Sequence, residues 1–272
     1  MEITNWKMLP SLGFYGLLYF SIRNIINYFQ LLLLRRPKLA AKRSNALLLA
    51  ATKSTRKSIW KYYKINSFIL PEVGTHIKPI ISENDNSTMN LIWIGRLIPG
   101  KALNLLLDSL PFLKDINYKL HIVGEGPCKV KWQKKAAKLD ISDNLIWYGW
   151  VDHSVVYDIL SNGSVMCITS MHDLTSTVIL EALSSGLPVI CPDHCGFSYV
   201  IDGTCGIKIP VSKPNEFIKD YSKALIKLSN FQVRNELKLG AIKRSEVFNW
   251  KMKIKELNYY YNKLLKIGVD SK

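Results

Sequence analysis

The chain is predicted to be an α/β protein built mainly around a parallel sheet flanked by helices. From residue 91 onward, short apolar runs alternate with stretches of helical spacing, which is typical of βαβ units. These runs contain few polar positions, as expected for strands that are covered on both faces. Three of them end in a glycine, at Gly95, Gly124 and Gly149, where a strand can turn sharply into a loop.

The elements after residue 90 follow one another in a regular order. The expected strands are the apolar runs at 91–95, 119–124, 144–149, 164–169, 188–191 and 206–210. The expected helices have apolar residues at helical spacing and cover about 102–113, 128–139, 153–161, 176–185, 214–229, 231–247 and 250–266. Because ligands bind at the carboxyl ends of the strands in such sheets, we expect the loops after the strands to line one cleft edge.

Residues 1–90 follow this alternation of strands and helices less regularly. The pattern predicts helices at 10–34, 38–45 and near 53–63, and strands at 46–51 and 67–72. This order resembles the end of another α/β domain without its beginning. The polar segment 82–89 is typical of a linker.

The apolar stretch 12–34 could be a membrane-associated helix or a core helix. Arg23, Asn24 and Asn27 lie near its middle, where a polar cluster makes a membrane span costly. Its apolar residues have helical spacing with one polar face, and several cations follow from Arg35 onward. The helix therefore either packs on a core or lies on an anionic membrane surface.

The chain has a formal net charge of +16, and residues 1–90 carry more than half of the excess. Such a charge suits an anionic partner: nucleic acid, a membrane surface or a phosphorylated small molecule. The sequence has no zinc-finger spacing, no RNP-like aromatic strand and no basic-zipper heptads, so we do not expect nucleic acid. The alternative is that many lysines simply solvate helices in the C-terminal half.

The cysteine pattern favours reduced thiols. There are five cysteines and no CxxC pair, and Cys167 and Cys191 lie in apolar runs, where a free cysteine acts as a small hydrophobe. Cys191, Cys195, Cys205 and His194 could in principle gather a metal ion. Their spacing matches no structural zinc pattern, so no metal site is expected. A cytosolic setting fits this usage best.

Two loops after predicted strands carry residues suited to phosphate binding. The segment GRLIPGK places Arg96 and Lys101 directly after a strand that ends at Gly95. An arginine can contact two phosphate oxygens and a lysine supplies a point charge. In the segment GEGP, Gly124 and Gly126 would let the backbone approach a ligand closely, although an ordinary strand–helix turn uses glycines in the same way.

A third loop holds two acids eight positions apart, Asp173 and Glu181, on either side of a hydroxyl cluster formed by Thr175, Ser176 and Thr177. The cluster can cap the helix that follows, and the free N–H groups of that helix form an anion site suited to a diphosphate. Glu181 follows three apolar residues and needs a partner, which ribose hydroxyls would provide. Alternatively, Asp173 is a helix cap and Glu181 a solvated helix residue.

Together these motifs resemble the family-4 retaining glycosyltransferases (glycosyl transferases group 1). The resemblance covers about residues 91–266 and is carried by Gly95-Arg96-Leu97…Lys101, Gly124-Glu125-Gly126-Pro127, Gly149, and Asp173…Glu181-Ala182-Leu183…Gly186-Leu187-Pro188-Val189-Ile190. It implies the GT-B fold, in which two Rossmann-like domains face a cleft and the C-terminal one holds most of the nucleotide-sugar donor. The two acids then correspond to the family's E-x7-E pair, with Asp173 where glutamate is more common.

The resemblance also implies roles for individual residues. Arg96 and Lys101 would neutralise the donor diphosphate and stabilise the leaving nucleoside diphosphate. Asp173 would contact the transferred sugar, and these three residues are the predicted catalytic set. Glu181 would hold the ribose hydroxyls, and backbone N–H groups at Thr175–Thr177 would contact the phosphates.

The remaining donor-binding positions implied by the resemblance are Gly95, Gly124 and Gly126. The implied domains are residues 1–88 as a helix-rich remnant of the acceptor-side domain, 89–247 as the donor-binding Rossmann-like domain, and 248–272 as a helix that packs back on the N-terminal part. The first part is about half as long as the family's N-terminal domain. None of the five histidines matches the family's usual active-site histidine.

The implied function is transfer of a sugar, with retention, from a nucleotide-sugar donor to a saccharide or lipid-linked acceptor in cell-surface polysaccharide or lipopolysaccharide biosynthesis. No cofactor or metal is expected. The expected location is cytoplasmic, either free or peripheral on the inner face of the plasma membrane. The alternatives are a nucleotide-sugar-binding module that cannot transfer sugar by itself and, with less support from the motifs, a GT-B sugar-nucleotide epimerase.

Overall fold

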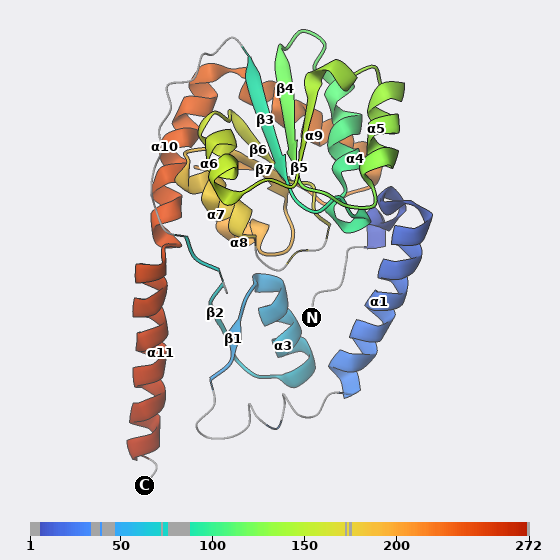
Figure 1. Ribbon diagram of the computed structural model, residues 1–272. Helices are drawn as coiled ribbons and strands as arrows, with labels where there is room; N and C mark the ends of the chain where they lie inside the picture. Colours follow the sequence, from blue (N-terminus) through green and yellow to red (C-terminus); the bar gives the residue numbers. More distant parts are fainter. Residues whose placement is uncertain are drawn as a thin grey trace.

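The computed structural model describes residues 6–33, 39, 47–71, 73–75, 88–171, 173 and 176–270, without the side chains of 6, 31, 32 and 266–270. Its larger sheet has six strands in the order β5-β4-β3-β6-β7-β8. A smaller sheet pairs two strands, β1 and β2. In Figure 1 the larger sheet and its helices lie above the smaller sheet.

All strand pairs of the larger sheet are parallel, which confirms the α/β class. The strands are β3 (Met89–Ile94), β4 (Tyr118–Val123), β5 (Leu145–Gly149), β6 (Val165–Cys167), β7 (Val189–Pro192) and β8 (Gly206–Ile209). The chain moves outward from β3 to β5 on one side, then crosses to β6 on the other side of β3. The strand order therefore reverses between β3 and β6, which is where open α/β sheets hold their ligands.

Helices cover both faces of this sheet (Figure 1). One face carries α4 (Leu103–Ser109), α5 (Lys129–Lys138) and α9 (Pro214–Ser229). The other carries α6 (His153–Ser161), α7 (Thr177–Ser184), α8 (Phe197–Val200) and α10 (Phe231–Val247). Each face has its own hydrophobic core, so the strands are buried on both sides, as the sequence predicts.

The sequence did not predict two details of these helices. The helix expected at 102–113 is shorter, because α4 ends at Ser109 and the chain continues as a 3-10 turn, η3 (Leu110–Phe112). Pro111 lies in that turn and has no N–H group to continue an α-helix. The four-residue helix α8 is too short to leave a periodic pattern in the sequence.

The N-terminal residues pack on the six-stranded unit. A 3-10 helix, η1 (Trp6–Leu12), leads into α1 (Gly13–Leu33). Met8, Leu9 and Leu12 are buried in the same core as α4 and α9. Asn104 Nδ2 donates a hydrogen bond to the Ser11 carbonyl oxygen at 2.8 Å. The segment η1 therefore belongs physically to the core of the six-stranded unit.

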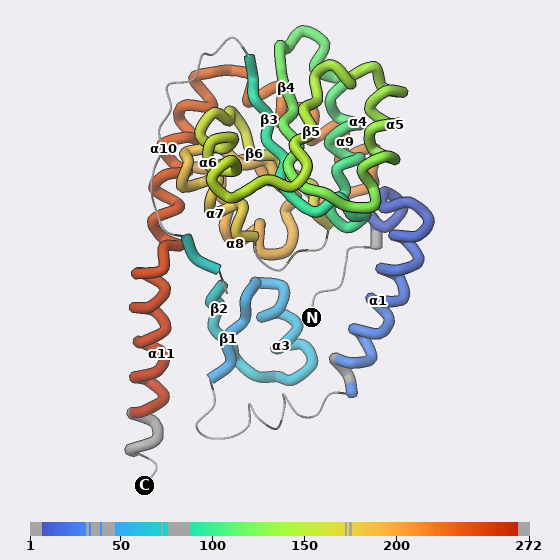
Figure 2. The backbone as a smooth tube through the Cα atoms, viewed as in Figure 1, coloured from blue at the N-terminus to red at the C-terminus, as the bar shows by residue number. Residues whose placement is uncertain are grey.

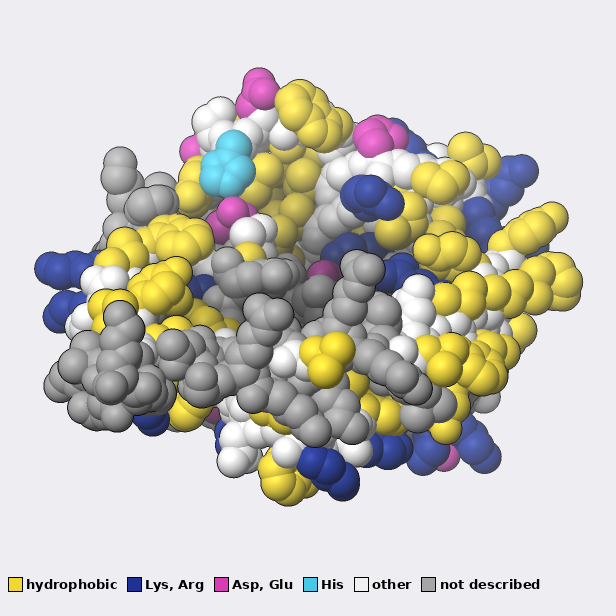
Figure 3. Space-filling view, turned by 90° about the horizontal axis from the view of Figure 1, so that it is seen from below, with side chains coloured by type: hydrophobic (Ala, Val, Ile, Leu, Met, Phe, Trp, Pro, Cys, Tyr) yellow, Lys and Arg dark blue, Asp and Glu magenta, His cyan; other side chains and the backbone are white. Residues whose placement is uncertain are grey.

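The rest of α1 presents a large apolar surface. Its inward side buries Asn24 and Asn27, whereas apolar side chains point outward. The exposed apolar residues of this helix are Phe14, Tyr15, Leu17, Leu18, Tyr19, Ile22, Ile25, Ile26, Tyr28, Phe29 and Leu33. Figure 3 shows hydrophobic side chains gathered over this side of the molecule. Within the described ranges, no helix combines the length and apolarity that a bilayer crossing requires.

The smaller unit consists of β1 (Leu49–Ala50), α3 (Lys53–Tyr63) and β2 (Phe68–Ile69). Its strands are parallel and shorter than the runs expected at 46–51 and 67–72. Thr52 caps α3, because its hydroxyl accepts a hydrogen bond from the Thr55 N–H at 3.0 Å. Apart from Leu39, the helix expected at 38–45 lies outside the described residues, as does the linker segment 82–87.

The last helix, α11 (Trp250–Asp270), follows α10 along one side of the molecule and passes the smaller sheet (Figure 2). Thr75 forms an isolated parallel bridge with Asn249 just before it. Lys253 donates hydrogen bonds to the carbonyl oxygens of Pro71 and Val73. These contacts place the C-terminal helix beside β2. The division into domains at residues 88 and 247 stays a prediction.

Candidate functional site

The candidate site lies at the carboxyl ends of β3 and β6, where the strand order of the sheet reverses. The loop after β3 contains residues 95–101 and ends in a 3-10 turn, η2 (Pro99–Lys101). The loop after β6 leads to α7. Because β3 and β6 are adjacent and parallel, the two loops emerge side by side.

An ion pair joins the two loops. Lys101 Nζ lies 2.5 Å from Asp173 Oδ2, and their side chains are 25% and 21% exposed. Thr169 supports the lysine, since its hydroxyl donates to the Lys101 carbonyl oxygen at 2.8 Å and accepts from the Trp93 indole N–H at 3.1 Å. Two of the residues singled out in the sequence are thus brought together, and the buried Thr169 hydroxyl holds the backbone of one of them.

Arg96 lies on the same loop and is exposed. Its guanidinium makes no hydrogen bond or ion pair with the residues that the structure describes. Lys101, in contrast, has a charged partner, because the Asp173 carboxylate already balances its charge. Within the described part of the chain, the loop after β3 therefore offers one unpaired and one paired cation beside the strand end.

The glycines of the next loop serve close packing between loops. Gly124 has φ +129°, and a Cβ atom there would lie 2.1 Å from the Gly95 carbonyl oxygen. At Gly126 a Cβ atom would lie 2.5 Å from the Leu97 carbonyl oxygen. Leu97 N–H donates to the Glu125 carbonyl oxygen at 2.8 Å. The loop after β4 thus fixes the shape of the loop after β3, and this alone explains the two glycines.

The start of α7 faces the same edge. Ser176 is its N-cap residue in extended conformation, but its hydroxyl forms no capping hydrogen bond with the helix. Thr177, the first helical residue, is exposed. Thr175 lies outside the described residues. Uncapped N–H groups at a helix start attract anions, which fits the expectation for this helix.

Glu181 has a partner that the sequence analysis missed. Its Oε1 lies 3.2 Å from His153 Nε2, and the two side chains are 16% and 63% exposed. His153 begins α6 and packs its ring edge-on against Tyr157, with 4.7 Å between the centroids. The one available signal was a histidine shortly after the strand that ends at Gly149, which is too common a feature to single out.

The cysteines and His194 support the fold. His194 Nε2 lies 3.0 Å from the Met171 carbonyl oxygen, and the Asp173 N–H donates to Cys195 Sγ at 3.5 Å, so both steady the loop after β6. Burial raises the pKa of Cys205 to about 11 and raises that of Cys191 further, which keeps these thiols protonated. No group of three or more His, Cys, Asp or Glu among the described residues could hold a metal ion.

Comparison with known proteins places the chain in a family. The family model for glycosyl transferases group 1 matches residues 78–243, more than half of the chain. The chain is 33% identical over 129 residues to the lipopolysaccharide 1,6-galactosyltransferase of Escherichia coli K12, covering 46% of this chain and 36% of that protein. It is 23% identical over 194 residues to a phosphatidylinositol N-acetylglucosaminyltransferase subunit from Arabidopsis thaliana, covering 70% and 42%.

Solved structures show the same fold. The lipopolysaccharide outer core galactosyltransferase WaaB matches with a TM-score of 0.69 at 22% identity, over 80% of this chain and 62% of that one. The pneumococcal O-GlcNAc transferase GtfA, solved with UDP and GlcNAc, matches with a TM-score of 0.66 at 19% identity, over 80% and 45%. The chain spans less than half the length of the curated relatives named above. With the GT-B fold and the family model in agreement, the chain belongs to the glycosyl transferases group 1 family.

Proposed function

We propose that the chain binds a nucleotide-sugar donor at the carboxyl edge of its six-stranded sheet and transfers the sugar, with retention, to a saccharide or lipid-linked acceptor. The pathway we propose is cell-surface polysaccharide or lipopolysaccharide biosynthesis. The observation that carries the proposal is the ion pair between Lys101 and Asp173 at the point where the strand order reverses. It brings together a cation and a carboxylate that can accept hydrogen bonds from sugar hydroxyls, at the edge where this fold holds its ligands.

The neighbouring groups suit a nucleoside diphosphate leaving group. Arg96 has an exposed guanidinium that can contact two phosphate oxygens, and Lys101 adds a second positive charge. The uncapped start of α7 supplies backbone N–H groups to the same anion. Cations and dipoles fixed in this way stabilise the negative charge that develops as the diphosphate departs.

The two acids suit the sugar parts of the donor. Asp173 can accept hydrogen bonds from hydroxyls of the transferred sugar while it keeps its contact with Lys101. Glu181 can accept from the ribose hydroxyls, and His153 would hold its carboxylate in one orientation. A carboxylate accepts several hydrogen bonds at once, so neither acid need lose its present partner.

A second candidate is a nucleotide-sugar-binding module that cannot transfer sugar by itself. The favouring observation is the size of the smaller sheet, whose described strands have two residues each. Such a sheet offers little surface to an acceptor. Donor binding without transfer by the chain alone would favour this candidate over the first.

The test is calorimetric titration of UDP, GDP and ADP into the wild type and an Arg96→Ala, Lys101→Ala double variant. We expect one nucleotide to bind and the double variant to weaken its binding by at least about 100-fold, since each charged contact to phosphate contributes about tenfold or more. A Lys223→Ala, Lys227→Ala variant removes the same charge from α9, remote from these loops, and should bind as the wild type does. No binding of any nucleotide at millimolar concentration would contradict the donor site.

We also propose that the chain acts at the cytoplasmic face of the plasma membrane, with α1 in the lipid interface. The exposed apolar side of α1 adjoins a groove of about 1050 Å³ between α1 and α5. Four lysines of α5 line this groove: Lys131, Lys134, Lys135 and Lys138. Apolar side chains beside a row of cations suit the surface of an anionic membrane.

Sedimentation with lipid vesicles tests the membrane proposal. We expect binding to vesicles that contain phosphatidylglycerol and much weaker binding to pure phosphatidylcholine. A Phe14→Ser, Tyr15→Ser variant should lose most of the binding, because both side chains are more than three-quarters exposed. Ile226→Ser on α9 is the control, since Ile226 is an exposed apolar residue on another helix. If the double variant bound these vesicles as well as the wild type does, the proposal would be contradicted.

A further inference from the structure

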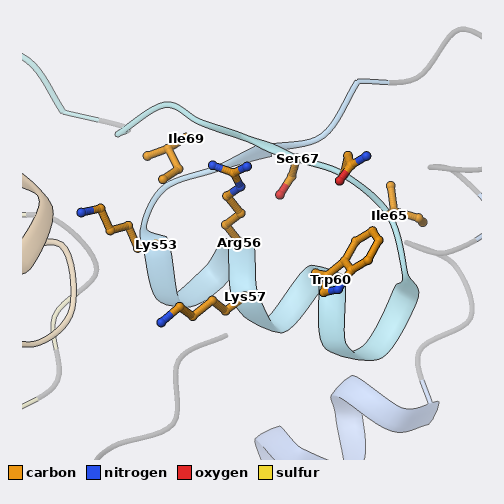
Figure 4. A pocket seen from close by; sticks show the side chains of 8 residues that line it. Lys53, Arg56, Lys57, Trp60, Ile65, Ser67 and Ile69 are labelled. Atoms are coloured by element: carbon orange, nitrogen blue, oxygen red, sulfur yellow. The ribbon is translucent and has the colours of Figure 1, made fainter.

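A second candidate binding site lies in the smaller unit, and none of its described lining residues belongs to the proposed donor site. A pocket of about 460 Å³ opens between α3 and the strand segment that contains β2 (Figure 4). Three cations, an indole ring, a buried hydroxyl and an isoleucine are among its lining groups: Lys53, Arg56, Lys57, Trp60, Ser67 and Ile69. The sequence analysis assigned none of them a role.

The buried hydroxyl is the first sign of a ligand. Ser67 is 4% exposed, and its Oγ is the one buried side-chain polar atom without a hydrogen-bond partner in the part of the chain that the structure describes. In Figure 4 this hydroxyl points from the strand side toward α3, into the pocket. Buried polar groups are nearly always satisfied. A single water molecule would fill only a small part of this volume, so the pocket has room for a larger polar partner.

The charges on α3 are the second sign. The side chains of Arg56 and Lys57 make no hydrogen bond or ion pair with any residue that the structure describes. Lys53 Nζ lies 5.7 Å from the centre of the Tyr199 ring, on the side of α3 that faces α8. Among the described residues, no carboxylate lines the pocket. Figure 4 shows Arg56 pointing toward Ser67, whereas Lys57 points away from it. A guanidinium beside a buried hydroxyl, in a pocket lined by two further cations, favours an anionic ligand.

Trp60 is the third sign. It lies four residues after Arg56, so the two side chains share one face of α3. The indole is 52% exposed, and Figure 4 shows it beside the pocket, with Ile65 near it. An exposed indole next to cations and a hydroxyl can stack on a flat ligand face that also carries polar groups. A sugar ring offers such a face through its C–H groups, and its hydroxyls lie at the rim.

We propose that this pocket binds an anionic saccharide of one or two rings that carries a carboxylate or a phosphate. The ring stacks on Trp60, the anion binds Arg56, and a ring hydroxyl shares a hydrogen bond with Ser67. The volume lies in the range of small-molecule sites. A neutral sugar leaves the cations unused, and a bare phosphate leaves Trp60 unused. The inference does not depend on the proposed donor site.

The test is calorimetric titration of the full chain with four probes: galacturonic acid, glucose 6-phosphate, methyl glucoside and inorganic phosphate. We expect one or both of the charged sugars to bind at least about tenfold more tightly than methyl glucoside and inorganic phosphate. Only the charged sugars can contact the cations, the indole and the hydroxyl at the same time. The two charged sugars also show whether the site prefers a carboxylate or a phosphate.

Three variants locate the binding. Arg56→Gln should weaken the charged sugar by about tenfold or more, whereas Lys61→Gln, which removes a charge from α3 outside the pocket, should not. Ser67→Ala should weaken it about fivefold without lowering the melting temperature, because an alanine removes a buried hydroxyl that has no partner among the described residues of the free protein. The Arg96→Ala, Lys101→Ala variant should bind the charged sugar as the wild type does, which separates this site from the donor site.

Three results would overturn the proposal. Inorganic phosphate that binds as tightly as the charged sugars would show only a general anion site. Equal losses in Arg56→Gln and Lys61→Gln would show that the total charge of α3, and not the pocket, sets the affinity. A lower melting temperature in Ser67→Ala would show that its hydroxyl serves the fold.

Discussion

At the scale of single residues, the site depends on pairs that are far apart in the sequence. Lys101 and Asp173 are separated by 72 positions and meet at 2.5 Å. The sequence motifs identified both residues, but not their contact, because a motif specifies residue types and spacing within one segment. Glu181 was identified as an acid in need of a partner, yet its neighbour His153 lies in another helix and became visible only in the fold.

Gly124 gives a residue-scale prediction. Gly124→Ala should lower the free energy of unfolding by about 2 kcal/mol or more, because the backbone has φ +129° and the new Cβ would lie 2.1 Å from the Gly95 carbonyl oxygen. Gly203→Ala is the matched control, since a Cβ there has no atom within 4 Å and should change the stability by less than about 0.5–1 kcal/mol. Urea unfolding followed by circular dichroism measures both. If Gly124→Ala proved as stable as Gly203→Ala, the strained geometry of the loop would be contradicted.

At the scale of elements, the positions of helices follow local signals where such signals exist. Pro214 begins α9, where a proline at the first helical position costs no hydrogen bond. Asn230 caps α10, since its side chain accepts from the Val233 N–H at 3.2 Å. Both helices begin and end at the residues expected from the sequence. The strands β1 and β2 are shorter than expected because a strand ends where its partner ends, and local propensity does not determine that point.

A charge cluster links the loop before β8 to α10 and gives a prediction at this scale. Asp202 Oδ1 accepts from the Thr204 hydroxyl at 2.6 Å and from the Thr204 N–H at 3.0 Å, and Arg244 Nε lies 3.5 Å from Asp202 Oδ2. The Thr204 hydroxyl first, and then its N–H and the Arg244 charge, hold the pKa of Asp202 below its ordinary value.

The sign of the pH effect follows from this lowered pKa. The stabilisation is complete above the pKa of an unfolded aspartate, about 4, and is lost as the pH falls through the lower pKa of the folded state. Asp202→Asn should therefore lower the melting temperature at pH 7 by about 1–3 °C, and the difference should shrink below about pH 4. Asp220→Asn removes a surface acid paired with Lys223 and should change little. If the difference in melting temperature between the wild type and Asp202→Asn did not change with pH, the role of the Asp202 charge would be contradicted.

At the scale of the whole molecule, segments distant in the sequence complete each unit. The segment η1 packs into the core of the six-stranded unit, although its sequence suggested part of a separate N-terminal domain. The helix α11 lies beside β2, where the Phe68 and Tyr260 rings are 5.0 Å apart. Neither contact leaves a local pattern, because burial of one apolar segment against another depends on which surfaces the rest of the chain exposes.

The packing of η1 gives a prediction for the whole molecule. Met8→Ala should lower the free energy of unfolding by about 2–5 kcal/mol, because Met8 is 0% exposed and lies in the core that α4 and α9 share. Phe14→Ala on the same N-terminal segment should change it by less than about 0.5 kcal/mol, since Phe14 is 76% exposed. Urea unfolding monitored by tryptophan fluorescence measures the free energy of unfolding of both variants. A Met8→Ala protein as stable as the wild type would show that η1 does not fold with this core.

The sequence alone determined the α/β class, the order of strands and helices after residue 90, the family, and the identity of Arg96, Lys101, Asp173 and Glu181 as candidate site residues. All of these depend on periodicity or on spacing within short segments, which the chain carries locally. The tertiary structure decided which of these residues touch and that His153 lies beside Glu181. It also decided that η1 joins the core of the six-stranded unit, and that Ser67 lines one pocket together with three cations and an indole. These are contacts between surfaces far apart along the chain, and such surfaces exist only after the sheet and its helices have packed.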